Sequence, residues 1–221
     1  MSLSHGPLMA TSGLIACIDA ANPKSYPGSG TAVYDISGNR NHATINGTVS
    51  YVNAGSGSYF NWATQADSNY IYSANSLSYV DITIVFQPDF TLTSGANLAM
   101  LISNGAATDK SMRFSNANGT GPWAISNPDN TDGWATGTAT TYYINGIAYT
   151  GSGNLSSGWN ILGAYRTNQS VYPLSSPYYL GTGYASRGYR GRIAAMYLYN
   201  RQLTAIEQQQ NFNALRGRYG I

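Results

Sequence analysis

The stretch Arg192-Ile193-Ala194-Ala195-Met196-Tyr197-Leu198-Tyr199 carries apolar side chains at every position after the arginine. Successive side chains of a β-strand point to opposite faces, so this run would present apolar residues on both. One face would hold Ile193, Ala195, Tyr197 and Tyr199, and the other Ala194, Met196 and Leu198. A strand of this kind is buried from both sides. We therefore predict a strand over residues 192–199 that is covered on each face.

The residues that follow predict a helix. Thr204-Ala205-Ile206-Glu207 has the capping-box pattern, in which the threonine accepts from the third helical amide and the glutamate reaches back. Glu207 is the only glutamate of the chain, so this structural role accounts for it. Gly217 is the expected end of the helix. An apolar stripe able to dock on a sheet falls at i, i+3 and i+7: Phe212, Leu215 and Tyr219.

Towards the N-terminus, turn residues separate short β-rich runs. Asn145-Gly146 joins residues 141–144 to residues 147–150, and this pair suits the positive φ angles of a type I′ hairpin. Other strand-like runs are 13–19, 44–52, 58–62, 70–72, 81–86, 98–103, 112–115, 123–126, 158–162 and 178–180. So many short strands without an internal repeat predict an all-β fold, a two-sheet antiparallel jelly-roll sandwich with one short C-terminal helix. We expect one domain over residues 13–221, preceded by an extended N-terminal arm, residues 1–12.

The composition agrees with this architecture and excludes several functions. Charged residues make up 9% of the 221 residues, whereas about 25% is usual. A net charge of +2 with only two lysines argues against a nucleic-acid partner. The 25 glycines and 19 tyrosines fit a turn-rich β protein better than long helices.

The sequence also bears on compartment. Cys17 is the only cysteine, so no internal disulfide or cysteine-based zinc site is expected, and its apolar run predicts a core residue. The start of the chain lacks the basic and long apolar regions of a signal peptide. No run approaches the ~18 apolar residues of a membrane span. We therefore expect synthesis in a cytoplasm without a signal peptide, and no membrane partner.

Few residues have the chemistry of an active site. Glycosidases use two carboxyl groups that flank the scissile bond, and the closest acids, Asp129 and Asp132, lie in a turn-rich stretch that favours a turn-forming role. His5 lies in the arm and His42 in a loop, without a nucleophile motif beside either. No phosphate-binding or dinucleotide motif occurs. We therefore expect that the protein is not an enzyme.

Two kinds of ligand site remain open. Asp35 and Asn39 could supply oxygen ligands to calcium, and the alternative is an Asx-turn in which Asp35 accepts from local amides; no other cofactor is expected. A glycan site would need aromatic faces and polar partners for sugar hydroxyls. The candidates for such a platform are tryptophans near Asn or Asp, namely Trp123, Trp134 and Trp159, together with Asp132. The alternative is that these tryptophans pack in the core.

Other residues are candidates for assembly contacts. Tyrosine and arginine are enriched in protein–protein interfaces. Arg187 and Arg190 belong to an arginine-rich segment that could meet an acidic partner, although a solvated face explains it slightly better. In the N-terminal arm, the apolar residues Leu3, Leu8 and Met9 are the contact candidates.

Both ends of the domain carry a resemblance to a known family. The opening has Asp19-Ala20-Ala21-Asn22-Pro23-Lys24 and then Tyr34-Asp35-Ile36-Ser37-Gly38-Asn39, and the end has Tyr199-Asn200-Arg201-Gln202-Leu203-Thr204. These segments resemble the laminin G-like, concanavalin A-like lectin-glucanase modules of virion proteins from tailed bacteriophages, especially cyanophages. The resemblance implies a concanavalin A-like sandwich. Such modules serve both as glycan binders and as structural pieces, so the fold alone does not assign a ligand.

From these observations we expect first a bacteriophage virion structural protein, in particular a capsid decoration or cement protein. Its partners would be other capsid or tail proteins and copies of itself, and its location the virion after synthesis in the host cytoplasm. The alternative is a glycan-binding host-adhesion module of a tail or fibre, with a host surface glycan as ligand. A polysaccharide-degrading enzyme is the third hypothesis.

Overall fold

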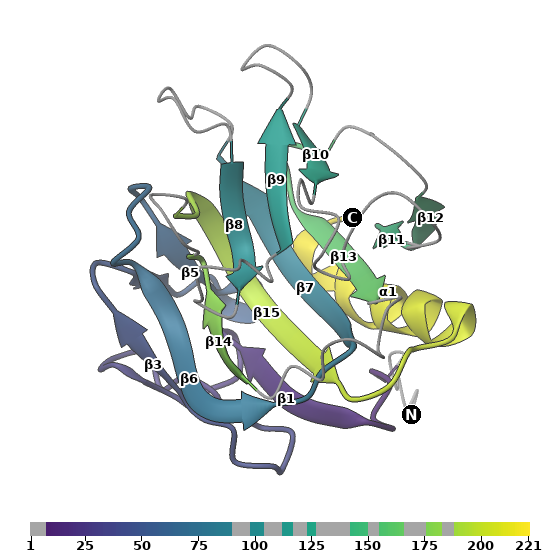
Figure 1. Ribbon diagram of the computed structural model, residues 1–221, viewed down its shortest axis with the longest axis horizontal. Helices are drawn as coiled ribbons and strands as arrows, with labels where there is room; N and C mark the ends of the chain where they lie inside the picture. The colour runs from purple at the N-terminus through teal and green to yellow at the C-terminus, as the bar shows by residue number, and fades with distance from the viewer. Residues whose placement is uncertain are drawn as a thin grey trace.

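Two antiparallel β-sheets stack on each other in the computed structural model (Figure 1), which describes residues 8–89, 98–103, 112–116, 123–126, 142–149, 155–165, 176–182 and 188–221. The eight-stranded sheet has the order β12 (Ile147–Tyr149), β11 (Tyr142–Ile144), β13 (Asn160–Tyr165), β7 (Asp81–Pro88), β15 (Gly191–Tyr199), β5 (Tyr59–Trp62) and β4 (Ser50–Val52), with β1 (Leu14–Asp19) also paired to β15. The seven-stranded sheet has the order β10 (Trp123–Ser126), β9 (Met112–Asn116), β8 (Leu98–Ser103), β14 (Ser176–Leu180), β6 (Tyr70–Leu77), β3 (Ala43–Asn46) and β2 (Ala32–Val33). A 3₁₀ turn, η1 (Gly55–Gly57), and one helix, α1 (Ala205–Tyr219), complete the described elements. The all-β sandwich with a C-terminal helix is therefore confirmed.

Two hydrophobic clusters divide the molecule into three layers. The larger cluster fills the space between the sheets, where Ile71 of the seven-stranded sheet and Phe86 and Met196 of the eight-stranded sheet are buried. The smaller cluster lies between the eight-stranded sheet and α1, and it joins Tyr197 to Leu215. Strand β15 thus contributes to both clusters, which confirms that it is covered on each face.

The alternation predicted within β15 is wrong at its start. A β-bulge between Ile193 and Ala195 places one extra residue in this strand against β7. Ile193 therefore joins Met196 and Leu198 in the inter-sheet cluster, while Ala194 lies with Ala195 in the cluster under α1. A bulge changes the face of every residue on one side of it, and the apolar pattern cannot reveal it because both faces are apolar.

Helix α1 begins as the sequence predicts and ends later. The Thr204 hydroxyl accepts from the Glu207 amide, and the Glu207 carboxylate accepts from the Thr204 amide at 2.9 Å, so both halves of the capping box are present. Leu215 and Tyr219 are buried and Phe212 is half-buried, as expected for the stripe. The predicted end at Gly217 is wrong, because the left-handed C-cap is Gly220, with φ 68°.

Glycines also set the loops beside the sheets. The predicted run 44–52 is two strands, β3 and β4, because Gly47 turns the chain with φ +71°. A Cβ at Gly47 would lie 2.4 Å from the Ser68 carbonyl oxygen, so this close approach requires glycine. The Asn145-Gly146 hairpin is confirmed, with φ angles of 52° and 78°. Within the described residues, no helix is both long and apolar enough to cross a membrane.

Candidate functional site

Three tyrosines gather on the outer face of the seven-stranded sheet, which points away from the inter-sheet cluster. Tyr70 and Tyr72 belong to β6, and Tyr179 belongs to the adjacent strand β14. The ring centroids of Tyr72 and Tyr179 are 4.6 Å apart, and those of Tyr70 and Tyr179 are 5.3 Å apart. All three side chains are half-buried, so each ring keeps part of its surface in water. They form one continuous aromatic surface.

Strand alternation explains why these rings face outward. Ile71 lies between the two tyrosines of β6 and is fully buried in the inter-sheet cluster, as is Leu180, which follows Tyr179 on β14. Ile71 pairs with Leu180 and Tyr72 pairs with Tyr179, so the inner and outer rows are in register. Because side chains in a strand alternate between faces, an apolar inner row fixes the tyrosines on the outer face.

Strand β3 adds polar side chains to the same surface. Thr44 pairs with Tyr72 and Asn46 pairs with Tyr70, and therefore both lie in the outer rows. Thr44 is exposed and Asn46 is half-buried. Figure 1 shows β3, β6 and β14 side by side. We call Thr44, Asn46, Tyr70, Tyr72 and Tyr179 the tyrosine face.

The tyrosine face carries no formal charge at neutral pH. Partial burial raises the pKa of Tyr179, and the neighbouring Tyr72 and Tyr70 raise it further. The phenol therefore stays protonated and can both donate and accept a hydrogen bond. A neutral face of aromatic rings and short polar side chains is suited to a neutral, hydroxyl-rich ligand.

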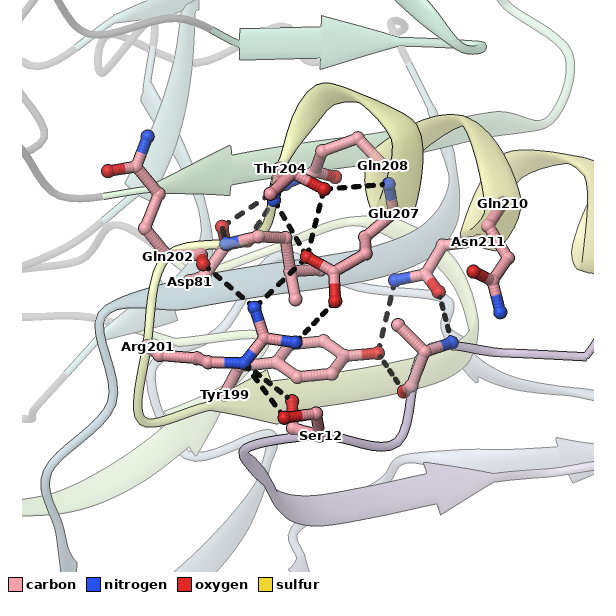
Figure 2. A network of polar contacts seen from close by, with 12 residues as sticks. Ser12, Asp81, Tyr199, Arg201, Gln202, Thr204, Glu207, Gln208, Gln210 and Asn211 are labelled. Carbon is pink, nitrogen blue, oxygen red and sulfur yellow. Dashed lines mark hydrogen bonds and ion pairs between the residues drawn. The ribbon is translucent and has the colours of Figure 1, made fainter.

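A second cluster of polar residues, drawn in Figure 2, holds α1 on the eight-stranded sheet. The Asp81 carboxylate, fully buried at the start of β7, accepts from the Leu203 amide at 2.8 Å and from Gln208 Nε2 at 3.0 Å. Arg201 forms an ion pair with Glu207, and its Nε donates to the Ser12 carbonyl at 3.0 Å. These contacts join a loop, a strand and the helix, and their role is structural.

The same cluster fixes residues 8–12 of the N-terminal arm. The Ala10 amide donates to Asn211 Oδ1 at 2.8 Å, and the Tyr199 hydroxyl donates to the Ala10 carbonyl at 3.1 Å. Gln210 Nε2 donates to the Leu8 carbonyl at 2.6 Å. This part of the arm therefore lies along α1, as the stick view shows for Gln210 and Asn211 (Figure 2).

Three of the assembly candidates, Leu8, Met9 and Arg190, lie in the described part of the chain. Leu8 is 75% exposed and Met9 is half-buried against the cluster under α1. Arg190 lies far along the chain and forms an ion pair with Asp89 at 2.9 Å. Leu3 and Arg187 lie outside the described residues. Their role in assembly stays a prediction.

Of the predicted glycan residues, Trp159 has a described side chain, and it lies apart from the tyrosine face. Trp159 is half-buried beside α1, with its ring 5.0 Å from that of Tyr219 and 5.7 Å from that of Tyr59. Trp123 begins β10, but its side chain is outside the described part of the structure. Asp129, Asp132 and Trp134 are outside it as well.

The calcium candidates have local hydrogen-bond partners. Asp35 is buried, and its two carboxylate oxygens accept from the amides of Cys17, Ser37 and Asn41 at 2.8–2.9 Å. The bond from the Ser37 amide is that of an Asx-turn, the alternative which the sequence offered. The Asn39 amide group donates to Leu14 O at 3.1 Å. Within the described ranges, no group of three or more His, Cys, Asp and Glu residues could hold a metal ion.

The sequence contained a signal for the tyrosine face. Both runs, Tyr70-Ile71-Tyr72 and Tyr178-Tyr179-Leu180, lie in predicted strands. Alternation puts Tyr70 and Tyr72 on the face opposite to that of Ile71, and Tyr179 on the face opposite to that of Leu180. The pairing of the two strands could not be read from them, because they are separated by more than 100 residues in the chain.

Comparison with known proteins agrees with the fold. No family model matches the chain, and no curated protein matches it. Among solved structures, Trypanosoma rangeli sialidase in complex with the inhibitor DANA has a TM-score of 0.58 at 15% identity, with 96% of this chain and 34% of that chain covered. The chain thus spans about a third of the sialidase.

Two further structures are similar at lower scores. Domain 4 of AbnA, a GH43 extracellular arabinanase from Geobacillus stearothermophilus, in complex with arabinotriose, has a TM-score of 0.49 at 14% identity, with 92% of this chain and 98% of that chain covered. The binding domain of Paraclostridial Mosquitocidal Protein 1 has a TM-score of 0.45 at 12% identity, with 91% and 52% covered. At these identities the sialidase similarity supports the β-sandwich fold, and nothing narrower.

Proposed function

We propose that this β-sandwich is a carbohydrate-binding module and that the tyrosine face is its binding surface. The observation that carries the proposal is the contact among Tyr70, Tyr72 and Tyr179 on the outer face of the seven-stranded sheet, where the rings are half-buried and no two ring centroids are more than 6.4 Å apart. Aromatic surfaces of this kind pack against the C–H groups of a sugar ring. The sialidase that shares the fold is itself described in complex with sialic acid, so the fold is compatible with a carbohydrate role.

The chemistry of the face favours a neutral saccharide. Thr44 and Asn46 lie beside the rings and can exchange hydrogen bonds with sugar hydroxyls. None of the five residues is charged, so a charged group would be desolvated here without a partner. Because the surface is open, we expect weak binding, with a Kd on the order of 0.1–1 mM for a short oligosaccharide.

The proposal assigns binding without turnover. Glycosidases of the common type use two carboxyl groups, and none of the five residues of the tyrosine face carries one. A binding module needs only a preformed surface, and the pairing of β6 with both β3 and β14 provides one.

A glycan array tests the proposal. We expect the wild-type protein to retain a set of neutral oligosaccharides and the Tyr179→Ala protein to lose them. Tyr143→Ala is the matched control, because Tyr143 is also half-buried but lies on β11 of the eight-stranded sheet. Retention of the same glycans by Tyr179→Ala would contradict the proposal.

A capsid decoration or cement protein of a bacteriophage is a second candidate, supported by one observation. Leu8 and Ile206 are 75% and 80% exposed, and Gln210, one helical turn after Ile206, donates to the Leu8 carbonyl. Two large apolar side chains in this region favour a contact with another protein, such as a virion protein or a second copy. Loss of binding to phage particles by Leu8→Asp would support this role, and unchanged binding would contradict it.

A further inference from the structure

A groove of about 380 Å³ lies at one end of the eight-stranded sheet, where β5, β7 and β15 meet. Its polar lining includes Asn61, Gln87, Asp89 and Arg192, and the Ser157 loop borders it. Its volume lies in the range of small-ligand sites. The tyrosine face belongs to the other sheet, so the groove is independent of the site proposed above.

Strand register places three polar side chains in one row across this groove. Arg192 pairs with Asn61 on one side and with Gln87 on the other. The next row pairs Ile193 with Phe60 and Phe86, and these residues are buried between the sheets. Because side chains alternate, the row of Asn61, Arg192 and Gln87 lies on the opposite, outer face.

Neighbouring groups hold the Arg192 side chain in place. Its Nη1 donates to Gln87 Oε1 at 2.9 Å, and Gln87 Nε2 in turn donates to the Ser157 carbonyl at 3.1 Å. The guanidinium also lies over the Tyr59 ring, 4.9 Å from its centroid. A guanidinium has five N–H donors, and these contacts leave the Nε–Nη2 edge for a ligand. Arg192 itself is exposed to solvent.

The charges in the groove do not cancel. Asp89 is paired with Arg190 at 2.9 Å. Among the described residues, no carboxylate lies within ion-pair distance of Arg192. The groove therefore has one uncompensated positive charge beside the Asn61 amide, whose side chain has no protein partner within the described part of the chain.

We propose that this groove binds an acidic saccharide, a sugar that carries a carboxylate. The carboxylate pairs with the Nε–Nη2 edge of Arg192, a geometry in which two parallel hydrogen bonds form. Asn61 and Gln87 exchange hydrogen bonds with the sugar hydroxyls. A single free guanidinium with Asp89 in the wall suits a singly charged ligand better than a phosphate, which carries more charge.

Paired monosaccharides test this inference. D-glucuronic acid and D-glucose differ only in the C6 carboxylate, and so do D-galacturonic acid and D-galactose. We titrate each sugar into the protein at low salt and follow binding by NMR. In at least one of the two pairs, we expect the uronic acid to bind at least about tenfold more tightly than its neutral partner. Binding should weaken as sodium chloride is raised, because salt screens the ion pair.

Two variants locate the site. Arg192→Gln keeps a long polar side chain and should weaken uronate binding by about tenfold. Arg216→Gln is the control, because this arginine is exposed on α1 and does not line the groove, and it should change binding by less than about twofold. Both residues are exposed, and a thermal melt checks that each variant folds.

The remaining outcomes separate this site from the tyrosine face. Tyr72→Ala should leave uronate binding unchanged, and loss of neutral-glycan binding with retained uronate binding would leave this inference intact. Equal affinity for the acid and the neutral sugar would overturn it, and so would Arg192→Gln binding the uronate as tightly as wild type. Sodium acetate bound as tightly as either uronate would also overturn it, because the site would then be an anion site.

Discussion

At the residue scale, Asp81 is a buried acid whose pKa is strongly raised. It is fully buried, and burial raises the pKa of its carboxyl to about 7, although donors from Leu203 and Gln208 oppose the rise. The folded state therefore favours the protonated form, whereas the unfolded chain has the ordinary pKa of about 3.9. Between these two values, folding is coupled to proton uptake.

This coupling predicts how stability depends on pH. The contribution of Asp81 to the free energy of unfolding is fully present below about pH 4 and is lost as pH rises through about 7. The total loss is at most on the order of 4 kcal/mol. Glu207 acts in the opposite direction, because its hydrogen bond with Arg201 lowers its pKa to about 2. Its contribution to the free energy of unfolding is present above about pH 4.5 and is lost as the pH falls towards 2.

Urea unfolding between pH 5 and pH 8 separates the contribution of Asp81 from that of Glu207, because Glu207 stays ionised throughout this range. We expect the wild-type free energy of unfolding to decrease with rising pH, and Asp81→Asn to flatten this slope because it cannot ionise. The same slope in both proteins would show that Asp81 is not the titrating group.

At the element scale, helix α1 combines a cap with a docked stripe, and the two differ in energy. Thr204 is exposed at the cap, whereas Leu215 is 1% exposed in the cluster under the helix. Removal of a capping side chain costs about 1 kcal/mol. Truncation of a buried leucine costs about 2–5 kcal/mol, because a cavity remains.

We therefore predict that Leu215→Ala destabilises the protein at least twice as much as Thr204→Ala. Thr204→Ser keeps the capping hydroxyl and should lie close to wild type. Chemical denaturation of the three variants gives the comparison. A Thr204→Ala effect as large as that of Leu215→Ala would mean that packing on the sheet does not hold the helix.

The elements also show which features the sequence could predict. The capping box and the Asn145-Gly146 hairpin were predictable, because each depends on residues only a few positions apart. The bulge at Ile193 was not, because both faces of β15 are apolar and a shift leaves the pattern unchanged. The end of α1 is predicted too early because two glycines, Gly217 and Gly220, lie near the end of the stripe, and only Gly220 is the C-cap.

The candidate site was less predictable than the elements. Sequence proximity to Asn and Asp selected Trp159, which packs beside α1. The tyrosine face depends on the pairing of β6 with β14, and long-range pairing is not encoded in any local pattern. The same holds for the row of Asn61, Arg192 and Gln87, which comes from three separate strands.

At the scale of the whole molecule, the layers formed by the described residues carry two candidate binding surfaces. Helix α1 and the arm cover part of the outer face of the eight-stranded sheet, and the groove lies at the end of this sheet. The outer face of the seven-stranded sheet holds the tyrosine face. A charge content of 9% fits a protein whose binding surface is aromatic and neutral rather than ionic.

The central claim is that the tyrosine face binds neutral saccharides. Its most direct test is calorimetric titration of the strongest array ligand into wild type, Tyr72→Ala and Tyr143→Ala. We predict that Tyr72→Ala weakens binding by about tenfold or more, equivalent to about 1.4 kcal/mol, while Tyr143→Ala, on the eight-stranded sheet, stays within about twofold of wild type. Equal affinities for wild type and Tyr72→Ala would contradict the claim.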